Sequence, residues 1–319
     1  MRAVVCTLFE KHYHLGVAVL VNSLARAGFA GEFHAGFRGP LPPWAAGSAT
    51  QRDAMTWEMP VEGGLRLVLK QVETDAHFTN FKPDFMLETL TASGADAVLY
   101  CDPDVVVNAT WIYLEEWLSC GVAVCDDVNS PMAENHPRRV GWRRFFAEHG
   151  HALRYRGSRY ANAGVVGVAR ENARLLEVWR DLLAAATASL GGADVVGIGS
   201  GGRMLKGAYG FADCFRQPDQ DTLNAALEAC PEIPVSFLGK QAMGFDAGTP
   251  LLPHATGSRK PWTRRFVREA LSGRAPARVD KYFWKFADGP LWPFDASRVR
   301  ATRWRVTVAA ALGRFIRRT

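Results

Sequence analysis

Short apolar runs alternate along this chain with segments whose apolar residues recur at helical spacing. A strand, a helix and a further strand form the repeating unit of α/β folds with a parallel sheet. We therefore predict an α/β fold with a Rossmann-like, mostly parallel central sheet flanked by helices. The predicted strands are residues 3–8, 32–37, 65–71, 97–101, 122–125 and 163–168, and the predicted helices are residues 15–27, 81–90, 111–119, 171–183 and 219–228.

The length and composition are those of a folded protein. The 319 residues suffice for one large domain or two small ones. No apolar run reaches the length of about 18 residues that a membrane-spanning helix needs. Residues 1–9 lack the long apolar region and cleavage site of a signal peptide. The six cysteines have no metal-binding spacing, which favours a reducing, cytoplasmic location.

Charge is unevenly distributed along the chain. Residues 256–319 hold 16 Lys or Arg and four Asp or Glu, whereas the whole chain has a net charge of only +6. This asymmetry predicts a polyanion or an anionic membrane as a partner of the C-terminal end. We expect a catalytic domain over residues 1–290 and a basic tail over residues 291–319.

The tail itself has two interpretations. Residues 298–319 contain seven Arg and no acid, and Trp304, Val308, Ala311, Leu312 and Phe315 recur at helical spacing. A basic amphipathic helix of this kind is typical of a membrane-surface anchor. The alternative is a helix that packs on the domain and exposes a solvated Arg face.

Two acids follow the predicted strand at residues 97–101 directly. Asp102 and Asp104 stand one residue apart, and the apolar residues 105–107 come next. Carboxylates between apolar runs are usually paired or bound to a metal. The acids could hold a divalent cation that bridges to a phosphate, or they could belong to an ordinary surface loop.

Four further segments carry polar side chains that suit the same chemistry. Asn162 precedes an apolar strand, Asp219 and Gln220 open a predicted helix, and Lys82 lies near the start of another. His254 is six residues before Lys260, with Gly257 between them. Each feature alone can also be structural, as a turn, a helix cap or an exposed side chain. Together, two carboxylates and a histidine suit Mn²⁺, and lysines suit a diphosphate.

The order of these motifs resembles family 8 glycosyltransferases, the group that includes glycogenin and the bacterial lipooligosaccharide and lipopolysaccharide galactosyltransferases. The resemblance covers residues 1 to about 265. It rests on Val5-Cys6-Thr7-Leu8, Tyr13, Gly16, Leu20 and Ser23-Leu24, on Asp102-Pro103-Asp104, on Asn162-Ala163-Gly164, on Asp219-Gln220-Asp221 with Leu223-Asn224, and on His254, Gly257 and Lys260-Pro261-Trp262.

The resemblance implies a GT-A fold and transfer of a hexose from a nucleotide sugar, usually a uridine diphosphate sugar, with retention of anomeric configuration. The acceptor would be a glycan or a lipid-linked glycan, as in lipopolysaccharide or polysaccharide biosynthesis. The basic tail would then hold the protein at the inner face of a bacterial cytoplasmic membrane. The implied roles are Mn²⁺ or Mg²⁺ on Asp102, Asp104 and His254; diphosphate contacts from Gly257 and Lys260; a base pocket lined by Leu8 and Tyr13; and a basic contact from Lys82.

The same resemblance places Asp219 and Gln220 beneath the donor sugar and Asn162 near it. Gln220 is a weak nucleophile, so we expect it to stabilise the sugar cation electrostatically rather than to form a covalent bond. One departure concerns the base. The family often has Asn or Asp before the Tyr, whereas this chain has Phe9-Glu10-Lys11-His12.

Two rival functions stay open at this point. A haloacid-dehalogenase-type phosphatase also has a strand that ends in two acids, with Asp102 as its nucleophile and with Asp126 and Asp127 as later metal ligands. A non-catalytic protein that binds polyanions is the second rival, although no nucleic-acid motif is present. The Gly-rich residues 191–202 match no motif of the family, and we expect a flexible loop there.

Overall fold

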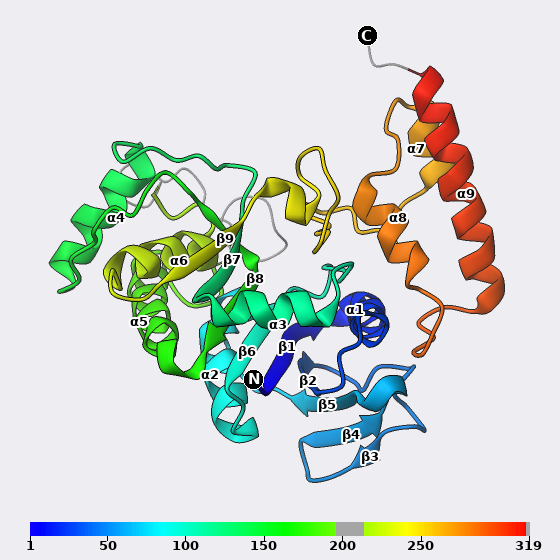
Figure 1. Cartoon of the computed structure of the whole chain (residues 1–319), viewed down its shortest axis with the longest axis horizontal. Helices are drawn as coiled ribbons and strands as arrows, with labels where there is room; N and C mark the ends of the chain where they lie inside the picture. Colours follow the sequence, from blue (N-terminus) through cyan, green and yellow to red (C-terminus); the bar gives the residue numbers. More distant parts are fainter. Residues whose placement is uncertain (196–213, 317–319) are drawn as a thin grey trace. The chain divides into compact units, whose positions relative to one another are not determined.

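The computed structural model describes residues 1–195 and 214–316. It divides into two compact units, each assembled from several stretches of the chain. The first unit comprises Met1–Leu8, Val72–Cys101 and Tyr113–Lys240, and the second comprises Phe9–Gln71, Asp102–Ile112 and Gln241–Thr319. Figure 1 labels their elements. The predicted loop at residues 191–202 lies outside the described residues from position 196 onward.

Five strands form the sheet of the first unit, in the order β1-β6-β8-β7-β9. They are β1 (Ala3–Glu10, whose last two residues belong to the second unit), β6 (Ala97–Cys101), β7 (Val122–Asp126), β8 (Ala161–Ala169) and β9 (Val235–Leu238). β1 pairs parallel with β6, and β7 pairs parallel with β9, whereas β8 runs antiparallel to both of its neighbours. The strands β6, β7 and β8 are buried at every position, as expected for strands covered on both faces.

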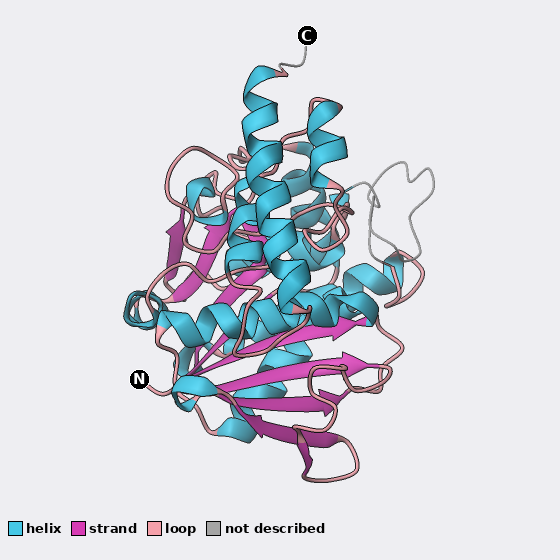
Figure 2. Cartoon of the chain, turned by 90° about the vertical axis from the view of Figure 1, so that its right-hand side faces the viewer, coloured by secondary structure: helices cyan, strands magenta, loops and turns pink. Residues whose placement is uncertain are grey.

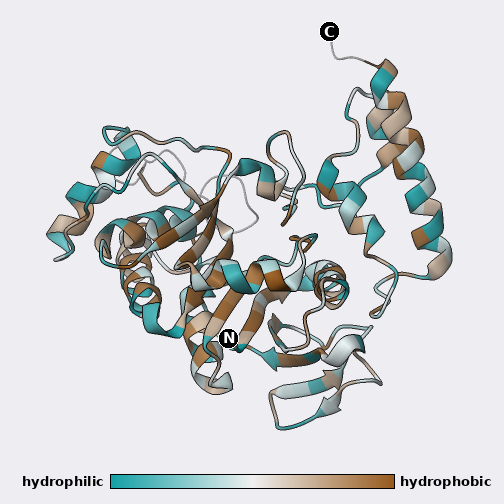
Figure 3. Cartoon of the chain, in the orientation of Figure 1, coloured by the Kyte–Doolittle hydropathy of each residue, from teal (hydrophilic) through white to brown (hydrophobic). Residues whose placement is uncertain are grey.

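Helices supply the covering layers of this unit. They are α2 (Lys82–Ser93), α3 (Trp111–Ser119, whose first two residues belong to the second unit), α4 (Pro137–Glu148), α5 (Arg174–Ser189) and α6 (Pro218–Ala229). α2 has Pro83 in its first turn and ends at Gly94, which adopts a left-handed φ of 61°. Helix α5 packs against α2 and α6. Its Trp179 joins Trp142 and Tyr160 in one hydrophobic core with the apolar strands, which Figure 3 colours brown.

The second unit has its own strands, in the order β3-β4-β5-β2. They are β2 (Glu32–Arg38), β3 (Thr50–Gln51), β4 (Thr56–Pro60) and β5 (Arg66–Gln71). β2 and β5 are parallel, and β3, β4 and β5 are joined in antiparallel pairs. The helix α1 (His14–Ala27) ends at Gly28, whose φ of 90° is the usual left-handed end of a helix.

The C-terminal helices complete the second unit. They are α7 (Phe266–Leu271), α8 (Arg278–Lys285) and α9 (Ala296–Phe315). Figure 2, in which helices are cyan, shows α9 running to the C-terminus, and α7 and α9 pack side by side. The Asn22 side chain on α1 donates to the carbonyls of Phe286 and Leu291 and accepts from the Leu291 N–H. This buried amide ties the C-terminal segment to α1.

Helix α9 presents apolar residues on two faces. Val299, Thr302, Val306 and Ala309 are buried, and the three apolar residues join a core that includes Trp262 and Phe283. On the opposite face, Trp304 is 67% exposed and Phe315 is 85% exposed. The predicted tail helix is therefore present, and it packs on the second unit while it also leaves two aromatic side chains in solvent.

The predicted α/β fold class is confirmed. Each strand and helix predicted from the pattern is present, with boundaries that shift by a few residues. The β3–β4 hairpin, α4, β9, α7 and α8 are not predicted by the sequence pattern. The boundary at residue 290 between a catalytic domain and a basic tail stays a prediction. Within the described residues, no helix combines the length and apolar character needed to cross a membrane.

Candidate active site

The two acids lie in a tight turn of the second unit that pairs with a distant segment. The Val105 N–H donates to the Asp102 carbonyl at 2.9 Å. Val105 also forms an antiparallel bridge with His254, and the Ala255 N–H donates to the Asp104 carbonyl at 3.1 Å. Backbone pairing therefore fixes His254 beside the acids, although about 150 residues separate them.

These three side chains form a compact ligand set. His254 Nε2 lies 3.2 Å from Asp104 Oδ1 and 3.7 Å from Asp102 Oδ2. One ligand atom from each residue can be chosen so that all three lie within 4.8 Å of one another. Carboxylate oxygens with an imidazole nitrogen suit Mn²⁺ well, and oxygen ligands suit Mg²⁺. His254 and Asp104 are buried, and buried charged groups are usually paired or coordinate a metal.

Lys260 neutralises part of this charge. Its Nζ lies 2.5 Å from Asp104 Oδ2 and 2.8 Å from the Ala255 carbonyl oxygen, and it stands 5.7 Å from the centre of the Tyr13 ring. Burial opposes the charge of each group, but their attraction is stronger. Attraction by His254 and Lys260 holds the pKa of Asp104 well below its usual range. Attraction by Asp104 raises the pKa of Lys260. Both groups are therefore charged at neutral pH.

An aromatic group stands next to this cluster. The His12 and Tyr13 rings stack at 4.9 Å, and Trp262 contacts Tyr13 edge-on at 5.7 Å. The Trp262 indole N–H donates to His12 Nδ1 at 3.0 Å. An indole nitrogen can only donate, so His12 Nδ1 accepts and the neutral ring carries its proton on Nε2. His12 is exposed, so its Nε2–H group can donate a hydrogen bond to a ligand.

Gly16 is a positioning residue whose role the sequence does not reveal. A Cβ atom there would lie 2.0 Å from the Pro103 carbonyl oxygen and 2.9 Å from the Trp262 ring. Only glycine therefore lets α1 approach the turn that carries Asp102 and Asp104. The family resemblance includes Gly16, but nothing in the local pattern shows why a glycine is needed there. Gly257, by contrast, is exposed with a φ of 84°, and a Cβ there would meet no atom within 4 Å.

Substitution of Gly16 by alanine is expected to weaken metal binding, because the Pro103 backbone must move and carry both acids with it. We expect Mn²⁺ affinity to fall by about tenfold or more, as for other changes that disturb ligand orientation. Titration calorimetry measures this. Gly63→Ala is the matched control, because Gly63 has a φ of 73° and no atom within 4 Å of a Cβ. That control should lose about 1 kcal/mol of stability through strain and keep its Mn²⁺ affinity.

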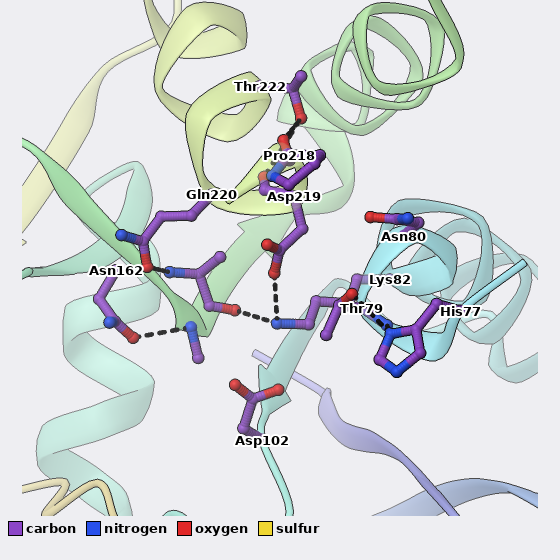
Figure 4. Close-up of polar contacts among 12 residues, drawn as sticks. His77, Thr79, Asn80, Lys82, Asp102, Asn162, Pro218, Asp219, Gln220 and Thr222 are labelled. Carbon is purple, nitrogen blue, oxygen red and sulfur yellow. Dashed lines mark hydrogen bonds and ion pairs between the residues drawn. The ribbon is translucent and has the colours of Figure 1, made fainter. Parts of the chain in front are cut away.

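The first unit holds a second polar cluster, shown in Figure 4. Lys82 Nζ donates to Asp219 Oδ2 and to the Ala163 carbonyl oxygen, both at 3.0 Å. Lys82 is only 2% exposed, and its ammonium lies 5.2 Å from the centre of the Tyr100 ring. The lysine thus holds the carboxylate at the start of α6 against the strand β8.

Gln220 and Asn162 are held by the backbone of β8. Gln220 Oε1 accepts from the Ala163 N–H at 3.2 Å, and Asn162 Oδ1 accepts from the Gly164 N–H at 2.9 Å. Gln220 Nε2 is buried, and it has no hydrogen bond of ordinary geometry within residues 1–195 and 214–316. Burial raises the pKa of the Tyr160 phenol well above its usual range, and the nearby Gln220 amide opposes this only weakly.

Asp127, which the pattern suggests only as a metal ligand of the rival phosphatase, is a further residue of this cluster. Its carboxylate accepts from Asn162 Nδ2 at 2.7 Å and from Asn129 Nδ2 at 2.6 Å. These bonds fix the orientation of the Asn162 amide, with its oxygen toward Gly164 and its nitrogen toward Asp127. Asp126 pairs instead with Arg159 at 2.7 Å. No spacing in the sequence links Asp127 to Asn162.

Asp221 is buried behind these residues. It accepts from the Tyr160 hydroxyl at 2.7 Å and from the Gln217 N–H at 2.9 Å, and it pairs with Arg138. Burial raises the pKa of Asp221 to about 6, against the opposing charge of Arg138. The carboxyl therefore takes up a proton in the folded protein at a higher pH than in the unfolded chain.

This shift predicts a pH dependence of stability. Between about pH 6 and pH 4 the folded state binds a proton at Asp221 that the unfolded state does not, because the unfolded pKa is about 3.9. The contribution of Asp221 to the free energy of unfolding therefore rises by about 2 kcal/mol as the pH falls through this window. Urea denaturation of the native protein and of Asp221→Asn at several pH values measures it. A difference between the two proteins that stays constant from pH 7 to 4 would contradict the assignment.

The structure thus brings the predicted residues together in two sets. Asp102, Asp104, His254, Lys260 and Tyr13 lie together in the second unit, and Lys82, Asn162, Asp219 and Gln220 lie together in the first. Leu8 is buried in the hydrophobic core of the first unit.

Comparison with known proteins gives the class of fold. No family model matches the chain, and no curated protein matches its sequence. Among solved structures, the galactosyltransferase LgtC with donor and acceptor sugar analogues is 17% identical, with a TM-score of 0.53 over 92% of this chain and 98% of that one. An active-site glutamine variant of LgtC is also 17% identical, with the same TM-score over 95% and 99%.

The apo form of the glycosyltransferase GlyE from Streptococcus pneumoniae TIGR4 is similar too. It is 17% identical, with a TM-score of 0.51, and the match covers 96% of this chain and 64% of GlyE. The chain therefore spans about two thirds of the length of GlyE and nearly all of LgtC. It has the fold of these glycosyltransferases, which confirms the predicted GT-A fold.

Proposed function

We propose that the protein is a metal-dependent, retaining glycosyltransferase that moves a hexose from a uridine diphosphate sugar to a glycan or lipid-linked acceptor. The observation that carries the proposal is the Asp102, Asp104 and His254 cluster with Lys260 beside it, within a glycosyltransferase fold. A bound Mn²⁺ or Mg²⁺ would act as a Lewis acid that neutralises the diphosphate leaving group. Polysaccharide or lipopolysaccharide synthesis is the process we propose.

The second unit would bind the nucleoside diphosphate. Asp102, Asp104 and His254 would hold the metal, and Lys260 and the backbone near Gly257 would contact the phosphates. Lys260 suits this role because it is a protonated lysine already aimed at the metal ligands. Tyr13 would contact the base, and His12 would offer its Nε2 proton to the base or ribose.

The first unit would bind the donor sugar. Asp219 and Gln220 are fixed against β8, and Gln220 keeps a buried amide group without a strong partner among the described residues. A preoriented dipole of this kind can stabilise positive charge on the sugar without the cost of reorganisation. LgtC has an active-site glutamine, and we propose Gln220 for the equivalent task here. Lys82 would act chiefly by orienting Asp219, and Asn162 would contact the sugar.

The phosphatase is less favoured because its later metal acids are already engaged. Asp126 pairs with Arg159, and Asp127 holds Asn162 and Asn129. Incubation with a panel of uridine diphosphate sugars and Mn²⁺ separates the two functions. We expect release of uridine diphosphate that requires metal and increases with a glycan acceptor. Phosphate release from phosphomonoesters with intact nucleotide sugars would overturn the proposal.

We also propose that α9 contacts an anionic membrane surface. Trp304 and Phe315 are exposed on one face, and Arg300 and Arg314 are exposed nearby on the same helix. Aromatic side chains beside Arg suit the boundary between anionic headgroups and acyl chains. Removal of residues 298–319 is a poor test, since Val299, Val306 and Ala309 belong to the core.

Replacement of Trp304 and Phe315 by glutamine tests the membrane proposal without disturbing the core. We expect binding to vesicles that contain phosphatidylglycerol to fall by about tenfold, since two large apolar side chains lose their insertion energy. Vesicle sedimentation measures this. Ile112→Gln is the control, because Ile112 is 69% exposed at the start of another helix. Equal binding by the double variant and the native protein would contradict the proposal.

A further inference from the structure

A cavity of about 300 Å³ lies in the second unit, between α7 and α9. Its lining contains Trp262, Phe266, Trp284 and Thr302, which are all buried. Its remaining lining is almost wholly arginine, from the segment that leads into α7, from α7 itself and from α9. These residues are Arg264, Arg265, Arg268, Arg298 and Arg305, with Val267 between them.

The charge around this cavity is not balanced by the protein. Arg264 pairs with Glu269 at 2.8 Å and also with Asp280. Across the described parts of the chain, no carboxylate lies within ion-pair distance of the other four arginines, and no acid lines the cavity. Like charges that converge on one space repel each other, and a bound anion relieves the repulsion. Arg265, Arg268, Arg298 and Arg305 are exposed, so water solvates them in part. Their position around one cavity whose lining holds no acid is what favours an anionic ligand.

The shape and chemistry of the cavity narrow the class of ligand. Guanidinium groups match the oxygens of phosphate in paired hydrogen bonds, better than ammonium groups do. A volume of about 300 Å³ is at the lower end for small-molecule sites, so the cavity suits a headgroup rather than a whole nucleotide sugar. Arg298 already lies over the Phe294 ring, 4.6 Å from its centre, which restricts its motion.

We propose that this cavity, which we call the arginine pocket, binds phosphoryl groups, either as a free diphosphate or as the phosphate headgroup of a lipid. The site is distinct from the Asp102, Asp104 and His254 cluster and needs neither the metal nor the transfer reaction. Its aromatic floor includes Trp262 and Trp284. Occupancy is therefore expected to change tryptophan fluorescence.

The first experiment titrates the full-length protein with inorganic pyrophosphate in EDTA, which removes any metal-bound pyrophosphate, and follows tryptophan fluorescence. We expect saturable binding that Arg265→Gln/Arg268→Gln weakens by about tenfold or more, through loss of two charge-assisted contacts. Arg300→Gln/Arg314→Gln is the matched control, because it removes the same charge from exposed positions of α9 outside the pocket lining.

Equal weakening by the two double variants would overturn the proposal, since general charge would then account for binding. Absence of pyrophosphate binding by the native protein, together with vesicle binding that does not depend on Arg265 and Arg268, would overturn it as well. Arg265→Gln/Arg268→Gln should keep metal-dependent donor turnover, because neither arginine belongs to the Asp102, Asp104 and His254 cluster. Loss of pyrophosphate binding in EDTA with turnover intact separates the arginine pocket from the proposed donor site.

The second experiment identifies the source of the phosphate. Vesicles of phosphatidylcholine with about 20% phosphatidic acid offer the group as a lipid headgroup, under salt that screens weak surface attraction. Vesicle binding that pyrophosphate displaces, and that Arg265→Gln/Arg268→Gln abolishes, would assign a lipid headgroup. Pyrophosphate binding that needs both arginines, with vesicle binding that does not, would assign a free phosphate compound.

Discussion

The Asp104→Asn variant is expected to lose metal-dependent turnover almost completely. The Asp104 carboxylate lies within 3.2 Å of both His254 and Lys260, so its replacement removes a metal ligand and also the partner of a buried ammonium. We expect uridine diphosphate release to fall by at least about 100-fold and Mn²⁺ to cease to raise the melting temperature in the presence of donor. A coupled assay for uridine diphosphate and a thermal-shift titration measure these effects.

Two controls separate chemistry from folding in this test. Asp104→Asn leaves Lys260 buried without its partner, which is expected to cost about 3 kcal/mol. Asp104→Asn with Lys260→Met removes both charges and should recover much of that stability, but not the turnover. Asp246→Asn, at an exposed site of the same unit, should change neither property. Full metal-dependent turnover in Asp104→Asn would show that the metal site is wrongly assigned.

The Lys82→Met variant should lose both stability and turnover. It leaves the Asp219 carboxylate without the ammonium that holds it, in a site where the lysine is 2% exposed. Breaking such a buried pair typically costs about 3 to 5 kcal/mol. Urea denaturation measures the stability loss, and donor turnover by the fraction that folds measures the functional loss.

A rescue variant makes this second prediction specific. Lys82→Met with Asp219→Leu replaces the ion pair by apolar side chains, and such replacements are often neutral for stability. We expect the double variant to regain most of the stability and to stay inactive, because Asp219 is proposed to lie beneath the donor sugar. Recovery of turnover along with stability would assign both residues a purely structural role.

Much of the fold could be predicted because the spacing of apolar residues distinguishes buried strands from helices. Strand β6 is a continuous apolar run, β8 is one after Asn162, and the helices α1 and α5 have regular apolar stripes. Two of the elements that were missed lack such a signal. Both residues of strand β3 are exposed, and α4 opens with Pro137 and carries four arginines in a weakly apolar segment.

The site was predictable as a set of residue types but not as a set of contacts. Asp102, Asp104 and His254 stood out because acids and a histidine interrupt apolar runs. Lys82 pairs with Asp219, and Asp127 orients Asn162. Both contacts join side chains that are far apart in the sequence, so the pattern could not show them. The role of Gly16 depends on a carbonyl oxygen 2.0 Å from an absent Cβ, which no pattern of residue types records.

The interleaving of the two units has a consequence for synthesis on the ribosome. The second unit needs Phe9–Gln71 together with Gln241–Thr319, and the Asn22 side chain finds its partners at Phe286 and Leu291. Its helix α1 must therefore wait for the C-terminal part of the chain to emerge before its buried amide is satisfied. We expect nascent chains that stop near residue 240 to expose apolar surface of α1 and to bind chaperones, even when the strands of the first unit have already formed.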